Sequence, residues 1–116
     1  MAALAPLALS ACEPGPERGS ETPAPAVAAA LFAEHCSICH AEDGSGEGLR
    51  RRSLYVKPPD FRRVSWRRQR TLESVRDAIR EGKPGTDMPA WKQLDESETT
   101  ALAFHVLGFS ERGGRP

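Results

Sequence analysis

Residues that could bind a metal or form disulfides are scarce in this sequence of 116 residues, which contains three cysteines, three histidines and two methionines. A structural zinc site needs four ligands, and beyond residues 36–40 the cysteines and histidines supply no second closely spaced pair. No strand–helix–strand pattern surrounds the two neighbouring cysteines, as a thioredoxin-like redox motif would require. The sequence therefore favours neither a zinc site nor dithiol redox chemistry.

Long apolar stretches and an excess of one charge are also absent. The uncharged N-terminal run, residues 1–12, is about eight residues too short for a transmembrane helix. Sixteen basic and sixteen acidic residues give a net charge of zero, which indicates no particular partner. Length and a hydrophobic content of 39% predict one small domain with a tail.

What the sequence does contain is the pentapeptide Cys36-Ser37-Ile38-Cys39-His40. In this arrangement both cysteines can add to the vinyl groups of one haem while the histidine binds its iron. The spacing suits this chemistry because positions i and i+3 lie on one face of a helix. A zinc site and a simple disulfide between the two cysteines are the alternatives, and the disulfide leaves the histidine unexplained.

Residues 31–40 resemble the first helix and haem motif of class I cytochromes c, in the pattern Leu31-Phe32-x-x-His35-Cys36-x-x-Cys39-His40. In that family an aromatic residue at the place of Phe32 packs on the last helix. A loop between the last two helices supplies the sixth iron ligand, and Met88-Pro89 matches it. The resemblance implies an all-α fold over residues 27–109, with three main helices and haem-wrapping loops. It also implies one covalent haem c with His40 and Met88 as axial ligands.

Residues 50–70 are expected to form one of these loops. They hold nine of the sixteen basic residues and a single acid, Asp60, and consecutive prolines rule out a regular ladder. The resemblance implies that a proline carbonyl, of Pro58 or Pro59, accepts a hydrogen bond from the axial histidine. Tyr55 and Trp66 are candidates to hold the haem propionates, and a plain core position is the alternative for Trp66.

Capping patterns predict the other helices. One helix is expected to begin at residue 27 and to run into Cys36. A second is expected over residues 72–81, with Thr71 as N-cap and Gly82 after its end. A third is expected from Asp95, with Glu98 completing a capping box, to residue 107. Residues 110–116 are expected to be a frayed polar tail.

Several residues near the motif have two interpretations. His105 occupies a position where the family commonly has tyrosine, and a packed neutral histidine is favoured over a titrating group. His35, one residue before the first cysteine, is expected to face away from the haem. The glycine-rich run after the motif predicts a tight turn, with calcium binding through Asp43 and Glu47 as the alternative.

The N-terminal part predicts export and tethering. Residues 1–12 resemble the end of a secretory signal, and Leu9-Ser10-Ala11-Cys12 resembles the bacterial lipobox, in which the cysteine is lipidated. An ordinary cleaved signal is the alternative. Residues 13–26 contain four prolines and predict a flexible linker. Together they place the domain outside the cytoplasm, in a bacterial periplasm, anchored to a membrane through Cys12.

The predicted function is single-electron transfer, without enzymatic activity of its own. The basic residues of 50–70 would dock redox proteins with acidic surfaces, with a plain solvated face as the alternative for most of the arginines. An extracytoplasmic location argues against nucleic acid as a partner. The protein would act as a monomer or as a subunit through which electrons enter a respiratory complex. The alternative is a haem enzyme, or a gas or redox sensor, in which Met88 dissociates from the iron.

Overall fold

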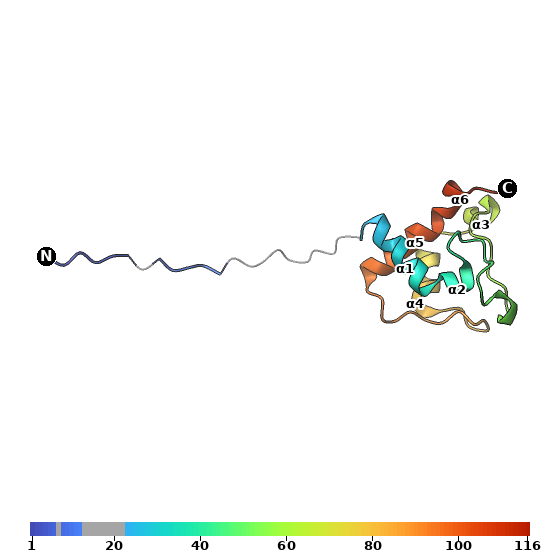
Figure 1. Ribbon diagram of the computed structural model, residues 1–116, viewed down its shortest axis with the longest axis horizontal. Coiled ribbons are helices and arrows are strands. Elements are labelled where there is room, and N and C mark those ends of the chain that lie inside the picture. The colour runs from blue at the N-terminus through green and yellow to red at the C-terminus, as the bar shows by residue number, and fades with distance from the viewer. Residues whose placement is uncertain (7, 13–22) are drawn as a thin grey trace.

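The structure is a computed structural model that describes residues 1–6, 8–12 and 23–116 (Figure 1). Its elements are α1 (Pro25–His35), α2 (Ser37–His40), the 3-10 helix η1 (Arg51–Ser53), α3 (Val64–Arg68), α4 (Leu72–Glu81), α5 (Glu96–Leu107) and α6 (Phe109–Arg112). No β-strand occurs in the described ranges, where an isolated bridge joins Arg63 to Arg115. Three helices, of 11, 10 and 12 residues, dominate the fold. The expected all-α architecture is confirmed.

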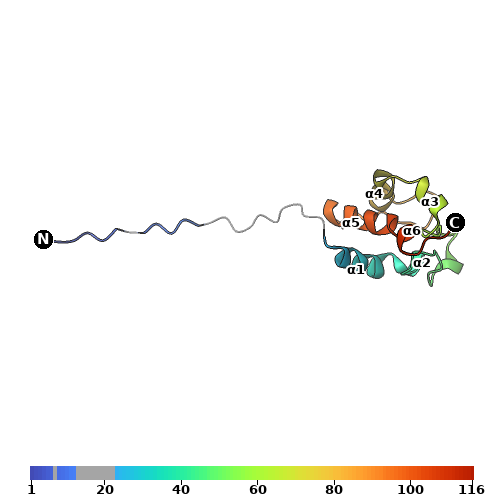
Figure 2. The same ribbon diagram turned by 90° about the horizontal axis from the view of Figure 1, so that it is seen from above.

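Helix α5 forms the centre of the domain, with α1 on one side and α4 on the other (Figure 2). It is buried on several sides because it carries mostly small and aliphatic residues, among them Leu102 and Ala103. From α1, the buried ring of Phe32 lies 5.1 Å from that of His105 and 5.1 Å from that of Phe109. The predicted contact between Phe32 and the last main helix is therefore confirmed.

The helix starts follow from local side-chain chemistry. The Thr71 hydroxyl accepts the Ser74 N–H at 3.0 Å, while the Ser74 hydroxyl accepts the Thr71 N–H at 2.9 Å. The same reciprocal pair joins Asp95 and Glu98 at the start of α5. Such capping boxes satisfy N–H groups that a helix leaves unpaired. Helix α1 begins at Pro25, two residues earlier than expected, because a proline is well tolerated in the first turn.

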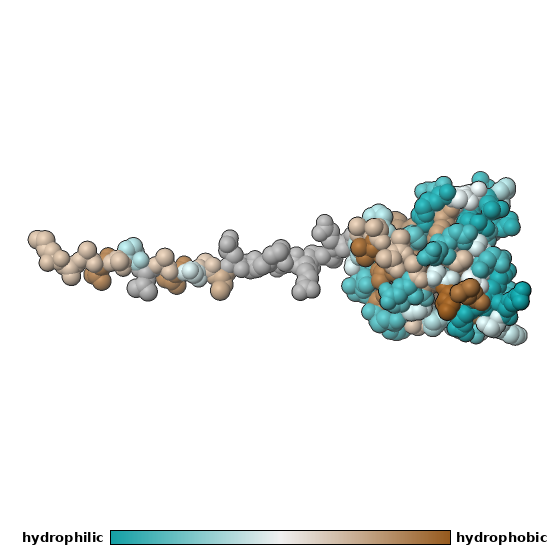
Figure 3. All heavy atoms as spheres, in the orientation of Figure 1, coloured by the Kyte–Doolittle hydropathy of each residue, from teal (hydrophilic) through white to brown (hydrophobic). Residues whose placement is uncertain are grey.

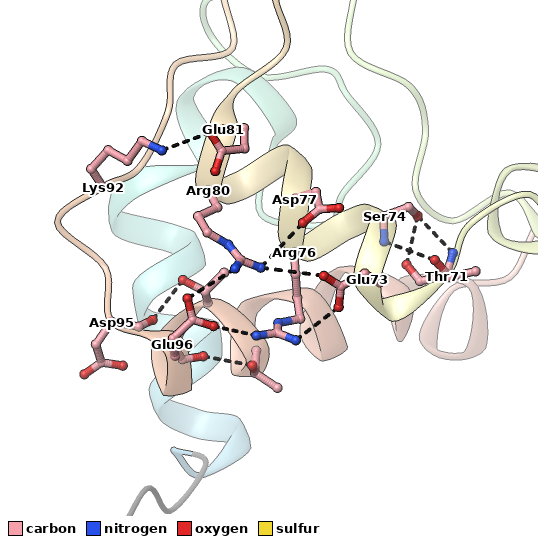
Figure 4. A network of polar contacts seen from close by, with 12 residues as sticks. Thr71, Glu73, Ser74, Arg76, Asp77, Arg80, Glu81, Lys92, Asp95 and Glu96 are labelled. Carbon is pink, nitrogen blue, oxygen red and sulfur yellow. Dashed lines mark hydrogen bonds and ion pairs between the residues drawn. The ribbon is translucent and has the colours of Figure 1, made fainter.

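Charged side chains connect α4 to the first turn of α5 (Figure 4). Arg76 contacts Glu73 at 3.2 Å and Glu96 at 2.5 Å, and Arg80 contacts Glu96 at 3.3 Å. The carboxylates are largely exposed, so each pair contributes little stability by itself. Together they fix the relative placement of α4 and α5, whose connecting loop contributes to the site described below.

Two predictions about irregular segments were wrong. Residues 64–68 form α3 within the stretch expected to lack helix. The predicted frayed tail begins with the helical residues of α6, and its end is held by backbone bonds from Val64 N–H to the Arg115 carbonyl and from Arg115 N–H to the Arg62 carbonyl. These are pairings between distant parts of the chain, which local composition does not encode.

The predicted linker and lipid anchor lie in the N-terminal part of the chain. Residues 13–22 of the expected linker lie outside the described residues. Cys12 is exposed and its thiol is free. Among the described helices, none combines the length and the apolar character needed to cross a membrane.

Candidate haem-binding site

A cavity of about 530 Å³ opens between α1, α2, the segment of residues 54–66, α4 and the loop before α5. Its volume falls within the roughly 300–1,000 Å³ typical of cofactor sites. Most of its lining is apolar, with Phe61, Ile79 and Val106 among the contributors. The four residues predicted to attach the haem or bind its iron line it together, namely Cys36, Cys39, His40 and Met88.

The two motif cysteines stand at the junction of α1 and α2. Both thiols are free, and both side chains are partly buried. Burial, followed by the neighbouring Cys39, raises the pKa of Cys36 to about 12. Within the described ranges no three His, Cys, Asp or Glu side chains gather in a metal-binding arrangement.

His40 has the properties of a neutral iron ligand. Burial lowers its pKa to about 4, so the imidazole keeps a free lone pair at neutral pH. Its ring stacks on Phe61, with centroids 4.8 Å apart and planes inclined by 20°. Its Nδ1 is buried and has no hydrogen-bond partner among the described residues.

The expected bond from His40 to a proline carbonyl is therefore not formed in this structure. Pro58 and Pro59 both line the cavity. The Pro58 carbonyl instead accepts a hydrogen bond from Arg51 Nη1 at 3.3 Å. Both prolines thus lie in the expected region. The Pro58 carbonyl, one of the two expected acceptors for His40, is bonded to Arg51, which the sequence did not predict.

Met88 reaches the cavity on the loop between α4 and α5. Gly82 starts this loop with φ of 71°, a conformation that favours glycine. The Met88 N–H donates to the Thr86 hydroxyl at 3.1 Å, and the Met88 carbonyl accepts the Lys83 N–H at 3.2 Å. The Trp91 N–H then donates to the Ile79 carbonyl at 2.9 Å. The loop is thereby held on both sides of the thioether.

Of the two residues predicted to hold the haem propionates, one lines the cavity and the other does not. Trp66 lines it, packs 4.6 Å from the ring of Phe61, and has the Arg70 guanidinium 5.4 Å above its own ring. Tyr55 is 88% exposed and does not line the cavity. Its backbone N–H donates to Asp87 at 2.8 Å. The structure therefore does not bring the Tyr55 side chain to the site.

The prediction that His35 faces away was wrong. Its side chain lines the cavity and lies 5.3 Å from the ring of Trp91. Helix α1 ends at His35, and Cys36 has φ of −115°, so the regular rotation of about 100° per residue does not carry across this junction. Trp91 itself was missed by sequence reasoning, although its position three residues after Met88 on a short loop was the available signal.

His105 and Asp43, two further residues discussed with the motif, have contacts that indicate structural roles. His105 does not line the cavity, and burial, followed by Arg112, lowers its pKa, which supports the packed neutral interpretation. Asp43 accepts the Ser45 N–H at 3.0 Å and pairs with Arg62 at 3.3 Å. With Gly44 and Gly46 at positive φ, this geometry is the predicted tight turn.

The donor set fits a covalently bound haem. It combines two free thiols, a neutral imidazole and a thioether around an apolar cavity. Thioether, imidazole and thiol-derived attachment are the chemistry of c-type haem proteins.

Comparison with known proteins agrees with this chemistry. The family model described as cytochrome c oxidase, cbb3-type, subunit III matches residues 23–106. A solved structure entitled KustC0563 c-type cytochrome is similar with a TM-score of 0.60 and 30% identity, over 71% of this chain and 95% of that one. A reducing HAO-like protein complex of Kuenenia stuttgartiensis, Kustc0457/Kustc0458, is similar with a TM-score of 0.62 and 26% identity. That match covers 78% of this chain and 43% of the other.

Proposed function

Since the chain belongs to the cytochrome c oxidase, cbb3-type, subunit III family and has the fold of a class I c-type cytochrome, we propose that it is an extracytoplasmic single-electron carrier with one haem c. The observation that carries the proposal is the meeting of four side chains on one cavity, three from residues 36–40 and one from residue 88.

Each of the four side chains has a role in the proposal. Cys36 and Cys39 would hold the haem through thioether bonds, and His40 and Met88 would bind its iron. The haem would supply reversible one-electron chemistry between ferric and ferrous iron. The chain would keep both axial positions filled and water excluded by the apolar walls, so that little rearrangement accompanies electron transfer.

Mass spectrometry and optical spectra test this proposal. The purified chain, expressed with haem-attachment machinery, should carry one covalent porphyrin and show the far-red sulfur-to-iron band in its ferric state. Met88→Leu, which keeps the size of the side chain, should abolish that band and let the ferrous protein bind carbon monoxide. A chain without a covalent porphyrin would refute the proposal. Carbon monoxide binding by the unaltered protein would instead favour the sensor or enzyme alternative.

A docking surface for acidic partners is the next part of the proposal. Several arginines of residues 50–70 are engaged internally, including Arg62, which pairs with Asp60 at 2.9 Å. The exposed side chains of Arg50 and Arg52 have no polar contact among the described residues, and Leu49 beside them is 95% exposed. The Arg50 N–H donates to the carbonyl of Ile38, which is 48% exposed. Figure 3 shows a hydrophobic patch among hydrophilic residues on the visible face of the domain.

This arrangement supports docking through an apolar spot beside free positive charge, close to the motif. The rate of oxidation by the anion hexacyanoferrate(III) should fall as ionic strength rises. Arg52→Gln should reduce that dependence, whereas Arg68→Gln, which removes an exposed charge from α3, should change it less. A salt-independent rate, or equal effects of the two variants, would remove the docking proposal.

Membrane tethering through Cys12 completes the proposed arrangement. The exposed free thiol and the lipobox-like residues before it support lipidation. Expressed in a bacterium with lipoprotein processing, the protein should partition with membranes and gain the mass of a lipid at residue 12. Cys12→Ser should release a haem-loaded protein into the periplasmic fraction. If both forms fractionate alike, the tether is wrong while the electron-transfer proposal stands.

A second candidate function is a place within a larger redox complex. The match to a chain of a reducing HAO-like protein complex, of which this chain spans 43%, favours it. Gentle extraction of membranes should then yield the protein together with other redox subunits, in constant ratio through two purification steps. A free shuttle would be recovered alone.

A further inference from the structure

Arg51 links the glycine-rich segment after His40 to the Pro58-Pro59 segment. Its Nη1 donates to the Gly46 carbonyl at 2.9 Å and to the Pro58 carbonyl at 3.3 Å. Its Nε lies 3.5 Å from a carboxylate oxygen of Glu47. With 32% of its side chain exposed, the guanidinium is held between two loops, unlike its neighbour Arg52.

One of the two residues whose carbonyls Arg51 contacts, Gly46, is hydrogen-bonded to the backbone of the motif histidine. The Gly46 N–H donates to the His40 carbonyl at 2.8 Å. Gly46, at φ of 80°, packs so closely that an added Cβ would lie 2.7 Å from the Pro58 oxygen and 2.9 Å from the Pro59 oxygen. A short chain of contacts thus runs from Arg51 through these carbonyls to His40.

His40 Nδ1 is buried without a hydrogen-bond partner among the described residues. Leaving a buried polar nitrogen unsatisfied is unfavourable, so a small adjustment that brings an acceptor to it would be favourable. The proline carbonyls are the acceptors that this chain of contacts supplies. One of them already accepts a hydrogen bond from a cation, which makes it a weaker acceptor for the imidazole.

We propose that Arg51 is a positioning residue that sets how strongly His40 donates electrons to the iron, an inference that rests on the proposed function. A weakly hydrogen-bonded Nδ1–H leaves the imidazole less basic, and a less basic ligand stabilises ferric iron less. The positive charge of the guanidinium acts in the same direction, because it disfavours the more positive oxidation state. Arg51 therefore raises the reduction potential.

The test compares Arg51→Gln with Arg52→Gln in the haem-loaded full chain. Both variants remove one positive charge, from adjacent residues, but only Arg51 contacts the loops beside His40. Redox titration should show that Arg51→Gln lowers the equilibrium constant for reduction about fivefold, or about 40 mV at 59 mV per tenfold change. Arg52→Gln should change it less than twofold. Arg51→Lys, which keeps the charge, should recover part of the loss.

A second variant protects the test against misfolding of the first. Glu47 is 69% exposed, so Glu47→Gln should fold, and it should raise the equilibrium constant because the guanidinium loses its neutralising partner. Glu42→Gln, an exposed acid in the same segment, serves as its control. NMR of the His40 Nδ1–H gives a readout independent of potential, since its resonance should shift in Arg51→Gln and not in Arg52→Gln.

The possible results separate the two proposals. Equal potential shifts in Arg51→Gln and Arg52→Gln, or in Glu47→Gln and Glu42→Gln, would overturn the role of Arg51 and leave the electron carrier intact. Absence of covalent haem or of histidine ligation in the unaltered protein would overturn both.

Discussion

Replacing Phe32 by alanine should cost about 3–5 kcal/mol of unfolding free energy. The ring is 2% exposed, so its removal forfeits most of the roughly 1.5–3 kcal/mol gained by burying such a side chain. It also loses its nearest ring contacts, at 5.1 Å to His105 and 5.1 Å to Phe109, each worth about 0.5–1.5 kcal/mol. Because α1 and α5 pack through this ring, little nearby structure can close the cavity left behind.

Urea unfolding of the haem-free and haem-loaded chains, followed by circular dichroism, would measure this loss. In thermal unfolding, a loss of 1 kcal/mol of stability lowers the melting temperature of a domain of this size by roughly 4–8 °C, so the melting temperature should fall by about 12–40 °C. Phe104→Ala provides a matched control, since it makes the same substitution on α5 at a ring that is 57% exposed. That control should lose about 1 kcal/mol or less.

Similar losses in Phe32→Ala and Phe104→Ala would contradict the packing argument. So would a loss below about 1.5 kcal/mol for Phe32→Ala with an unchanged denaturant dependence, because the helix crossing would then not depend on this ring.

Three further predictions address the loop, a cap and an ion pair. Gly82→Ala should destabilise the protein by more than about 1 kcal/mol and weaken the far-red band, because its Cβ would lie 2.8 Å from backbone atoms of the loop. The control is Gly85→Ala, which is also at positive φ but has open space around it, so it should leave the band intact. Loss of the band in both variants would refute the steric argument. Thr71→Ala should cost about 1 kcal/mol through loss of the capping box, and an unchanged urea midpoint would show that the cap does not contribute. Hydrogen bonding from Arg62 holds the pKa of Asp60 below its usual value of 3.8, so this pair stabilises the fold above that pH and the contribution disappears as pH falls through the folded pKa. Acid titration of stability should therefore be shallower for Asp60→Asn, and parallel curves would contradict this.

Much of the fold could be predicted because its determinants are local. The capping boxes at Thr71 and Asp95 and the glycine after α4 involve residues within four positions of each other, so the bounds of α4 matched the prediction. The short helix α3 and the pairing of Arg115 with residues 62–64 could not be predicted in this way. Their stability comes from contacts between segments separated by about fifty residues.

The proposed haem-binding residues follow from the sequence alone, because the spacing of two cysteines and a histidine is a property of consecutive residues, and the single internal methionine left one candidate thioether. Which neighbours share the cavity with them depends on how the whole chain folds. The tertiary structure turned His35 inward at the end of α1, left Tyr55 in solvent and placed Arg51 on the Pro58 carbonyl. The physical reason is that side-chain direction and hydrogen-bond partners depend on the backbone path through breaks and loops, where helical periodicity no longer applies.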